Sequence, residues 1–110
     1  MTQKYQVSWT RIAEIDLEQT VYFIAREQPE TALSIFRSIR SKAETLKQHP
    51  DRGRYLPEFS HYQGLPFREL VISPWRLVYH IKLKRVEILA FFDSRRDIEE
   101  ILFERLSRVL

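Results

Sequence analysis

The sequence has no cysteine and only two glycines and three histidines among its 110 residues. Without cysteine, disulfide bonds, thiolate nucleophiles and cysteine-ligated zinc sites are all excluded. The two glycines, Gly53 and Gly64, lack the neighbours that a phosphate-binding loop needs. His49, His61 and His80 lie far apart, and none has a second ligand three or four residues along a helix. We therefore expect neither a metal nor a cofactor, and no serine-hydrolase elbow or triad is visible either.

Long apolar runs are also lacking. No stretch approaches the roughly 20 residues that a membrane-spanning helix needs. The opening segment, residues 1–6, has no apolar core of the kind that a secretory signal carries. Because the absence of cysteine also suits a reducing compartment, we expect a cytoplasmic protein without membrane contact.

The residues that are present suffice for one hydrophobic core. Of the 110 residues, 44% are hydrophobic and 13% are aromatic. A chain of this length typically forms one domain that buries roughly 65% of its unfolded surface. We therefore expect residues 1–110 to form a single domain.

The net charge of +3 is unevenly distributed along the chain. Residues 1–50 carry seven basic and six acidic side chains, a balance of +1. Residues 86–110 carry four basic and six acidic side chains, a balance of −2. Residues 51–85 carry seven basic and three acidic side chains, a balance of +4. This positive segment could meet nucleic acid or an acidic protein, or it could be a solvated face without a partner.

Hydrophobic periodicity predicts a strand and two helices in the first half. Residues 4–9 alternate between polar and apolar, which is typical of a half-buried strand. Thr10 is a suitable N-cap for a helix that runs to about Gln28, and Pro29 suits the first turn of a second helix that ends at His49-Pro50. Their close spacing predicts an antiparallel hairpin. Its apolar stripes are Ala13, Leu17, Val21 and Ile24, widened by Tyr22 and Phe23, and then Ala32, Ile35, Phe36, Ile39, Ala43 and Leu46.

The second half predicts a long loop, three strands and a helix. Residues 51–66 hold both glycines and two prolines, and a loop of about 15 residues in a small domain is usually functional. Residues 67–73, 75–81 and 86–92 are typical of strands, and their short connections favour an antiparallel meander. From Ser94 onward, apolar residues recur with helical spacing. The predicted fold class is α+β, in the order β-α-α-β-β-β-α.

Two arginines interrupt the predicted strands. Arg68 lies in the otherwise apolar strand predicted at residues 67–73, and Arg76 lies in the next predicted strand, residues 75–81. One interpretation is structural, because an arginine on the solvated face of an antiparallel sheet needs no function. The other interpretation is a role in binding. The turn at Ser73-Pro74 does not determine the register, so the two arginines could share one face or lie on opposite faces.

Arg95 and Arg96 stand at the predicted start of the last helix, where the helix dipole disfavours cations by roughly a few tenths of a kcal/mol each. Ser94 and Asp97 make a reasonable capping arrangement, which does not account for the arginines. Pairing with nearby acids such as Asp93 is the structural interpretation. Binding of an anion or of a partner is the functional one.

Glu58 lies in the long loop, close to His61. A carboxylate beside several arginines could act as general base on an RNA 2′-hydroxyl while the arginines stabilise the phosphate. A solvated loop glutamate is the alternative.

A succession of short motifs follows the same course, with Gly53-Arg54, Pro57-Glu58, Arg68-Glu69-Leu70-Val71, Trp75-Arg76-Leu77-Val78-Tyr79, Ile88-Leu89-Ala90 and Arg95-Arg96-Asp97. In this order and spacing they resemble the RelE/ParE superfamily of bacterial type II toxin–antitoxin toxins, which includes plasmid stabilization proteins. The resemblance runs over nearly the whole chain, from the opening strand to the last helix. It implies a helical hairpin packed on a twisted antiparallel sheet, and a small toxin neutralised by an antitoxin that is encoded beside it.

Members of this superfamily differ in what they attack. Some cut messenger RNA at the ribosome without a metal, and others bind DNA gyrase and perform no chemistry. In the RNA-cutting branch a loop glutamate and a strand arginine are functional in several members, and they correspond here to Glu58 and Arg76. The Arg95-Arg96 pair before a C-terminal helix looks more like the ParE branch, in which His-Gly stands where this chain has Asp93-Ser94.

The first hypothesis is therefore a ParE-like toxin that inhibits growth by binding gyrase. Its contacts to the target or to the antitoxin would be Arg68, Arg76, Arg95 and Arg96.

The second hypothesis is a ribosome-dependent endoribonuclease. Its base would be Glu58 or His61, Arg76 would stabilise the transition state, and Arg68 or Arg95 would hold the RNA backbone. The third is an inactive protein that only binds the antitoxin and assists repression. In each case we expect an acidic, partly disordered antitoxin, DNA contact only through that antitoxin, and a homodimer or a heterotetramer with it.

Overall fold

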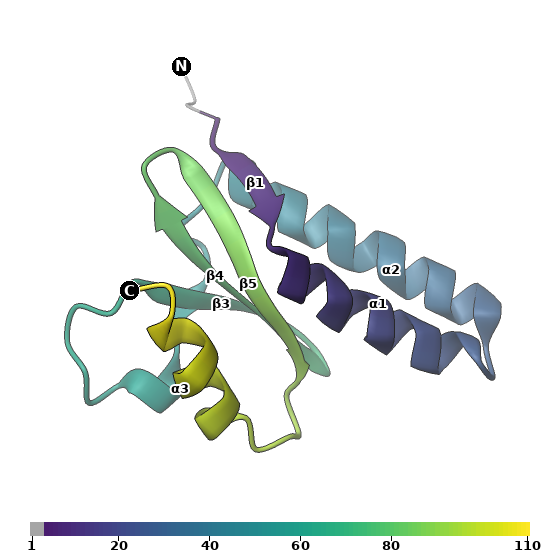
Figure 1. The fold of residues 1–110 in the computed structure, drawn as a ribbon. Helices are drawn as coiled ribbons and strands as arrows, with labels where there is room; N and C mark the ends of the chain where they lie inside the picture. The colour runs from purple at the N-terminus through teal and green to yellow at the C-terminus, as the bar shows by residue number, and fades with distance from the viewer. Residues whose placement is uncertain (1–3) are drawn as a thin grey trace.

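The chain folds into a five-stranded sheet with helices packed on both of its faces (Figure 1). The computed structural model describes residues 4–110. The predicted α+β class and element order are confirmed, and the long loop adds a two-residue strand and a short 3₁₀ helix. In chain order the elements are β1 (Gln6–Trp9), α1 (Arg11–Ala25), α2 (Pro29–Glu44), the 3₁₀ helix η1 (Thr45–Lys47), β2 (Arg54–Tyr55), the 3₁₀ helix η2 (Pro57–Phe59), β3 (Phe67–Ile72), β4 (Trp75–Lys82), β5 (Arg85–Asp93) and α3 (Glu99–Ser107).

The strands lie in the order β1-β5-β4-β3-β2. As predicted, β3, β4 and β5 form an antiparallel meander. The N-terminal strand joins β5 in parallel, with Val7 opposite Val86, and β2 pairs antiparallel with β3. One extra residue in β5, Leu89, lies between the pairs Tyr79–Ile88 and Val78–Ala90 and makes a β-bulge.

The helical hairpin forms as predicted, with shorter helices. Thr10 caps α1, since its Oγ1 accepts a hydrogen bond from the Ala13 amide at 3.3 Å. The prediction that this helix reaches Gln28 was wrong, because Gln28 precedes a proline and adopts φ −137° and ψ 75°, outside the helical region. The second helix ends at Glu44 and continues only as a 3₁₀ turn. None of the described helices is long and apolar enough to cross a membrane.

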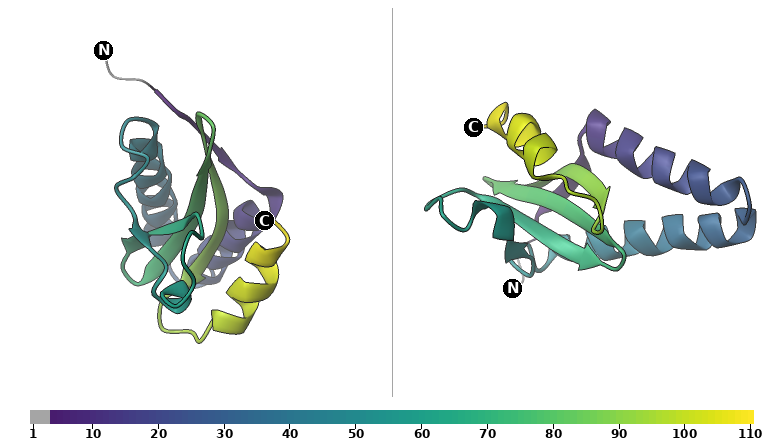
Figure 2. Two further views of the ribbon diagram at one scale, coloured as in Figure 1. Left: turned by 90° about the vertical axis from the view of Figure 1, so that its left-hand side faces the viewer. Right: turned by 90° about the horizontal axis from the view of Figure 1, so that it is seen from below.

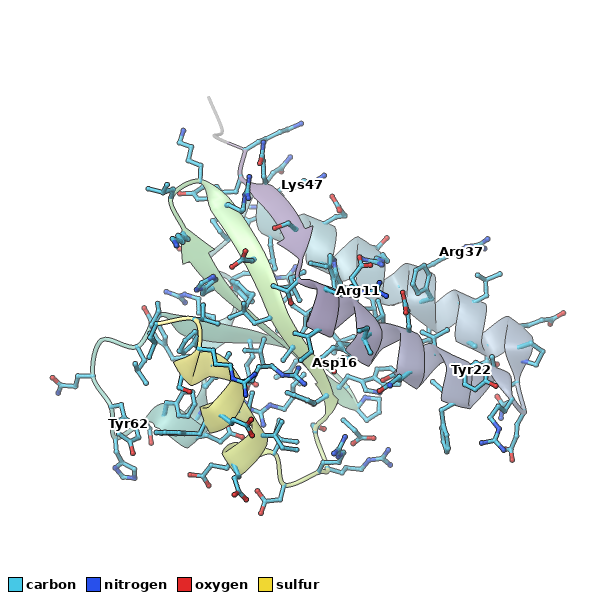
Figure 3. The ribbon with its side chains drawn as sticks, in the orientation of Figure 1. Arg11, Asp16, Tyr22, Arg37, Lys47 and Tyr62 are labelled. Carbon is cyan, nitrogen blue, oxygen red and sulfur yellow. The ribbon has the colours of Figure 1, made fainter. Side chains whose placement is uncertain are left out.

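The far end of the hairpin projects beyond the sheet (Figures 1 and 2). Tyr22 and Phe23, which we expected to widen the buried stripe, are therefore both 72% exposed, and Figure 3 shows Tyr22 near the end of α1. Burial is instead complete for Ala13 and Leu17, near the start of the helix, where the sheet is within reach.

Each face of the sheet has its own hydrophobic core. Alternation along β3 sends Leu70 and Ile72 to the core under α1 and α2, and sends Phe67 to the core under α3. Figure 2 shows α2 and α3 on either side of the strands in its left view. The interpretation of the strand arginines assumed one solvated face, and that assumption was wrong, because α3 and η2 cover the second face.

The last helix begins later than predicted. Its first residue is Glu99, so Arg95 and Arg96 lie in the turn before the helix and not in its first turn. The Ser94 amide donates to the Pro74 carbonyl at 2.7 Å and the Arg96 amide to the Asp93 carbonyl at 3.2 Å, which holds this segment in a turn. The expected conflict with the helix dipole therefore does not arise.

Candidate functional site

Arg76 lies inside a strand and has carboxylate partners on two sides. Its Nε donates to Glu69 Oε1 at 2.5 Å, and its Nη1 and Nη2 donate to the two oxygens of Glu58 at 2.5 and 2.6 Å. Glu69 also accepts from Arg54 Nε at 2.6 Å. The side chains of Arg76, Glu58 and Glu69 are 8%, 18% and 0% exposed. We call Arg54, Glu58, Glu69 and Arg76 the carboxylate–arginine cluster.

Glu58 reaches this cluster because aromatic packing holds its loop on the sheet. The 3₁₀ helix η2 begins at Pro57, whose ring favours the first turn of a helix. Next to Glu58, Phe59 is buried, with its ring 6.2 Å from that of Phe67 and 6.0 Å from that of Phe103. The loop that the sequence indicated as functional is thus ordered, and its carboxylate is directed at β4.

The cluster is electrically balanced, with two carboxylates and two guanidinium groups. Hydrogen bonds from Arg76 hold the pKa of Glu58 below its usual value, although partial burial opposes this effect. The same pairing, chiefly with Glu58, raises the pKa of Arg76. Each charged form therefore stabilises the other, and the arrangement fastens the loop to the sheet.

Arg68 points to the opposite face of the sheet. In the register of β3 and β4, Arg76 is paired with Val71, so these two side chains lie on the same face of the sheet. Arg68 is three residues before Val71 on β3, and since side chains alternate along a strand, it lies on the other face. Its Nη1 donates to the Gly53 carbonyl at 2.8 Å, its Nη2 donates to Tyr55 Oη at 3.0 Å, and its guanidinium lies 4.2 Å from the Tyr55 ring centroid. Arg68 and Arg76 therefore do not form one anion site.

A buried tyrosine fastens the start of the long loop. Tyr79 Oη donates to the Pro50 carbonyl at 2.6 Å and accepts from the Gly53 amide at 2.9 Å. A Cβ atom on Gly53 would lie 2.5 Å from Tyr79 Oη and 2.6 Å from the Glu69 carbonyl oxygen. Only glycine therefore lets the backbone of residue 53 come this close to Tyr79 and Glu69. Burial raises the pKa of Tyr79, which stays a neutral hydrogen-bonding group.

The turn after β5 presents two arginines to solvent. Arg95 pairs with Asp93 through its Nε at 2.9 Å and its Nη2 at 2.5 Å, and these bonds lower the pKa of Asp93 to about 2. Arg96 is exposed, and it forms no ion pair with any of residues 4–110. The charge without an ion-pair partner at this turn is therefore that of Arg96.

These two arginines stand at the rim of a groove between α1, the end of β5 and α3. The groove, which we call the α1–α3 groove, has a volume of about 660 Å³. Asp16 lies where the three elements meet (Figure 3), and it accepts from the Phe91 amide at 3.1 Å and from Arg105 Nη1 at 2.5 Å. Burial raises the pKa of Asp16, although both hydrogen bonds oppose this effect. The rest of the groove is lined by the polar side chains of Gln19, Thr20 and Asp93 and by apolar side chains, namely Phe23, Ile24, Trp75, Phe91, Phe92 and Ile101.

Of the residues singled out in the sequence, the structure brings together Glu58 and Arg76. Arg68 lies on the other face, Arg95 lies in the turn after β5, and His61 is exposed in the loop. Among residues 4–110, no three histidine or acidic side chains are placed to hold a metal ion.

Two functional features escaped the sequence interpretation. Glu69 is the buried partner of two arginines, and its place on the same strand face as the buried Phe67 could have marked it as buried. The Asp16–Arg105 pair joins residues 89 apart in sequence, and no local pattern indicates it.

Comparison with known families identifies the chain. Residues 7–98 match the model of the ParE toxin of the type II toxin–antitoxin system parDE. The chain belongs to this family. It is thus a toxin of the ParE/RelE type from a type II toxin–antitoxin system. A search of curated proteins gave no significant sequence match.

Solved structures support the fold of this ParE family member. The chromosomal ParDE system from P. aeruginosa aligns with a TM-score of 0.68 at 23% identity, over 83% of this chain and 97% of that one. The RelBE2 toxin–antitoxin complex from Mycobacterium tuberculosis gives 0.60 at 22% identity, over 84% and 94%. A mutant of the E. coli toxin RelE in the free state gives 0.59 at 16% identity, over 97% and 99%.

Proposed function

We propose that this ParE family toxin inhibits growth by binding DNA gyrase and performs no chemistry of its own. The observation that carries the proposal is the carboxylate–arginine cluster. Glu58 and Arg76 correspond to the loop glutamate and strand arginine of the RNA-cutting branch, and here they bind each other. A nuclease needs both groups available to the substrate.

Glu58 is poorly suited to act as a general base. A general base works best when its pKa is near the working pH, and Arg76 shifts the pKa of Glu58 downward, away from neutrality. Both oxygens of Glu58 are also occupied by the guanidinium. Proton abstraction would require the pair to separate and the buried Arg76 to lose one of its two carboxylate partners, which is costly.

Arg76 is equally poorly suited to stabilise a phosphate. It lies 8% exposed between two carboxylates, and a scissile phosphate would have to replace one of them against the repulsion of the other. Arg68 is on the opposite face and Arg95 is bound to Asp93. The arginines are thus better placed for stability and for contacts between proteins than for chemistry.

The antitoxin surface that we propose is the α1–α3 groove. Its wall is partly apolar, with Phe23 largely exposed, and it carries the exposed Arg95 and Arg96. An acidic amphipathic segment would place apolar residues against this wall and carboxylates against the rim, and would become ordered on binding. The names of the ParDE and RelBE2 structures point to such an antitoxin partner. Any DNA binding would be indirect, through the antitoxin.

The decisive experiment compares the wild type with the Glu58→Gln variant. Each is induced alone in a bacterium, and messenger RNA integrity, DNA double-strand breaks and growth are followed together. For a gyrase-binding toxin we expect intact transcripts, broken DNA and growth inhibition by both proteins. Glutamine retains one acceptor for Arg76, and circular dichroism of the purified proteins verifies that both are folded.

The other two hypotheses give different results in the same experiment. A RelE-like endoribonuclease would cut transcripts at the ribosome, and Glu58→Gln would abolish the cutting. An inactive co-repressor would leave growth unchanged when the wild type is induced without a partner. Either result would contradict the proposal.

A further inference from the structure

The tip of the β4–β5 hairpin has an unusual residue for its conformation. Leu83 has φ +57° and is 91% exposed, the largest exposure among the described large hydrophobic residues. Tight hairpin turns that need a positive φ strongly favour glycine, asparagine or aspartate, because a branched side chain is strained there. Folding alone thus favours neither the backbone conformation nor the exposed apolar side chain. Strain of this kind is a reason to look for a function.

Cations surround this leucine. Lys82, Lys84 and Arg85 belong to the same turn, and Lys4 reaches it from the chain before β1. Together they line a groove of about 680 Å³. None of the four forms an ion pair within the part of the chain that the structure describes. We call these four residues and Leu83 the cationic knob.

One acidic side chain, Glu87, lines this groove and lowers its net charge, but it pairs with none of the four cations. Glu87 is in contact with His80, whose Nε2 lies 2.8 Å from Glu87 Oε1. The Arg85 guanidinium donates a hydrogen bond to a neutral group, the side-chain oxygen of Gln6, at 3.3 Å. The knob therefore presents four cations without an ion-pair partner around one protruding apolar side chain, and the groove keeps a net positive charge with Glu87 counted.

We propose that the cationic knob is the contact by which this toxin holds its target, a protein surface with an apolar socket rimmed by carboxylates. This inference rests on the proposed function, in which the toxin acts by binding a protein. Leu83 would fill the socket as the desolvated anchor, and the surrounding lysines and arginine would pair with the rim and steer the encounter.

The composition of the knob favours protein over nucleic acid. The groove contains no aromatic ring on which a base could stack. An exposed leucine gains little from a phosphate backbone, whereas an apolar anchor inside a charged rim is a common design of protein interfaces. Contact with a nucleic acid backbone would use the cations and leave Leu83 without a role.

The knob is also separate from the proposed antitoxin groove. It lies at the start of β5, and the α1–α3 groove lies at the end of that strand (Figure 1). A strand of nine residues spans roughly 27 Å. The two surfaces can therefore be altered independently.

The test uses Leu83→Gly, which removes the anchor and also relieves the positive φ. We expect its melting temperature to equal or exceed that of the wild type, while growth inhibition and binding to purified gyrase holoenzyme weaken at least about tenfold. Asparagine also tolerates this positive φ, so Leu83→Asn should have the same effects as Leu83→Gly. The double variant Lys82→Glu/Lys84→Glu should also lose binding, and a matched reversal on α2, Arg37→Glu/Lys42→Glu, should not. Capture of the antitoxin should be unchanged in all of them.

The outcomes separate this inference from the proposed function. If the wild type inhibits growth and Leu83→Gly inhibits it equally, the knob is not the target contact and the proposed function stands. If the wild type is harmless when induced alone, both ideas fail. If labelled duplex DNA binds the wild type and the Leu83→Gly variant equally but not the lysine double variant, the knob contacts nucleic acid and the inference is overturned.

Discussion

Both carboxylate oxygens of Glu58 accept hydrogen bonds from the guanidinium of Arg76, 18 residues later in the chain, at 2.5 and 2.6 Å. The remaining nitrogen of that guanidinium, Nε, bonds to Glu69. The long loop is thereby fastened to the centre of the sheet through one arginine. This contact stabilises the loop, makes the stability sensitive to acid and occupies both oxygens of Glu58.

Stability should fall in acid partly through Glu58. Because its pKa in the folded state is lowered from 4.5, its ionised form stabilises the fold above pH 4.5, and this contribution disappears as the pH falls through the folded-state value. Chemical denaturation of wild type and Glu58→Gln should differ by about 2 kcal/mol at neutral pH. The difference should narrow steadily below pH 4.5. A constant difference at all pH values would show that the pair contributes no ionic stabilisation.

Gly53→Ala should destabilise the protein by about 2 kcal/mol, because the new Cβ atom would collide with Tyr79 Oη and the Glu69 carbonyl. The measurement is thermal or urea unfolding. Gly64→Ala is the matched control, since no atom lies within 4 Å of its Cβ position and only the φ of +81° opposes the substitution. We expect this control to cost about 1 kcal/mol. Equal losses at the two glycines would mean that the close approach at Gly53 does not matter.

Asp16 connects α1, β5 and α3, so Asp16→Ala should cost about 2 kcal/mol by leaving Phe91 N–H and Arg105 without their acceptor. Asp16→Asn should cost less. The side-chain oxygen of asparagine can still accept a hydrogen bond from the Phe91 amide. Asparagine is also neutral, so it avoids the cost of burying a charge, the same cost that raises the pKa of Asp16.

The control for the Asp16 series is Glu104→Ala, which breaks the ion pair between Glu104 and Arg108. The side chains of Glu104 and Arg108 are 71% and 75% exposed. Exposed pairs contribute little, so its free energy of unfolding should change by less than about 0.5 kcal/mol. If the asparagine variant proved as unstable as the alanine variant, the charge rather than the amide contact would be the important part.

Antitoxin affinity should be more sensitive to Arg96 than to Arg95. Arg95 is already paired with Asp93, whereas Arg96 has no ion pair among the described residues, so its charge is available to an acidic segment. Arg96→Glu should weaken binding by about tenfold or more, with Arg95→Glu closer to the wild type. Calorimetric titration at low and high salt would measure this, and the Arg96 effect should shrink as salt screens the charge. The reverse ranking would place the antitoxin on another part of the turn.

Much of the fold could be predicted because its signals are local. The alternation around Val7, the helical stripe ending at Leu46 and the cap at Thr10 each depend on a few neighbouring residues. Errors occurred where a distant contact decides the boundary. The last helix begins at Glu99 because the preceding turn bonds to Pro74. Tyr22 and Phe23 are exposed because the hairpin extends beyond the sheet.

The candidate site shows the same division. The sequence indicated Glu58, Arg68, Arg76, Arg95 and Arg96 as residue types suited to binding or chemistry. It could not assign their faces, since one residue of register reverses every side chain in a strand. The observed register sends Arg68 and Arg76 to opposite faces and seats Arg76 between Glu58 and Glu69.

By itself, the sequence determined the α+β class, the order of the elements and the absence of cysteine chemistry, because composition and periodicity are properties of neighbouring residues. The resemblance to the family came from the succession of its short motifs. Only the tertiary structure decided which charges are neutralised and which are free. Coulomb energy and burial depend on distances between residues far apart in the chain, such as Asp16 and Arg105. The same reason explains why Arg76 is buried between two carboxylates, while Arg96 and Leu83 are exposed to solvent.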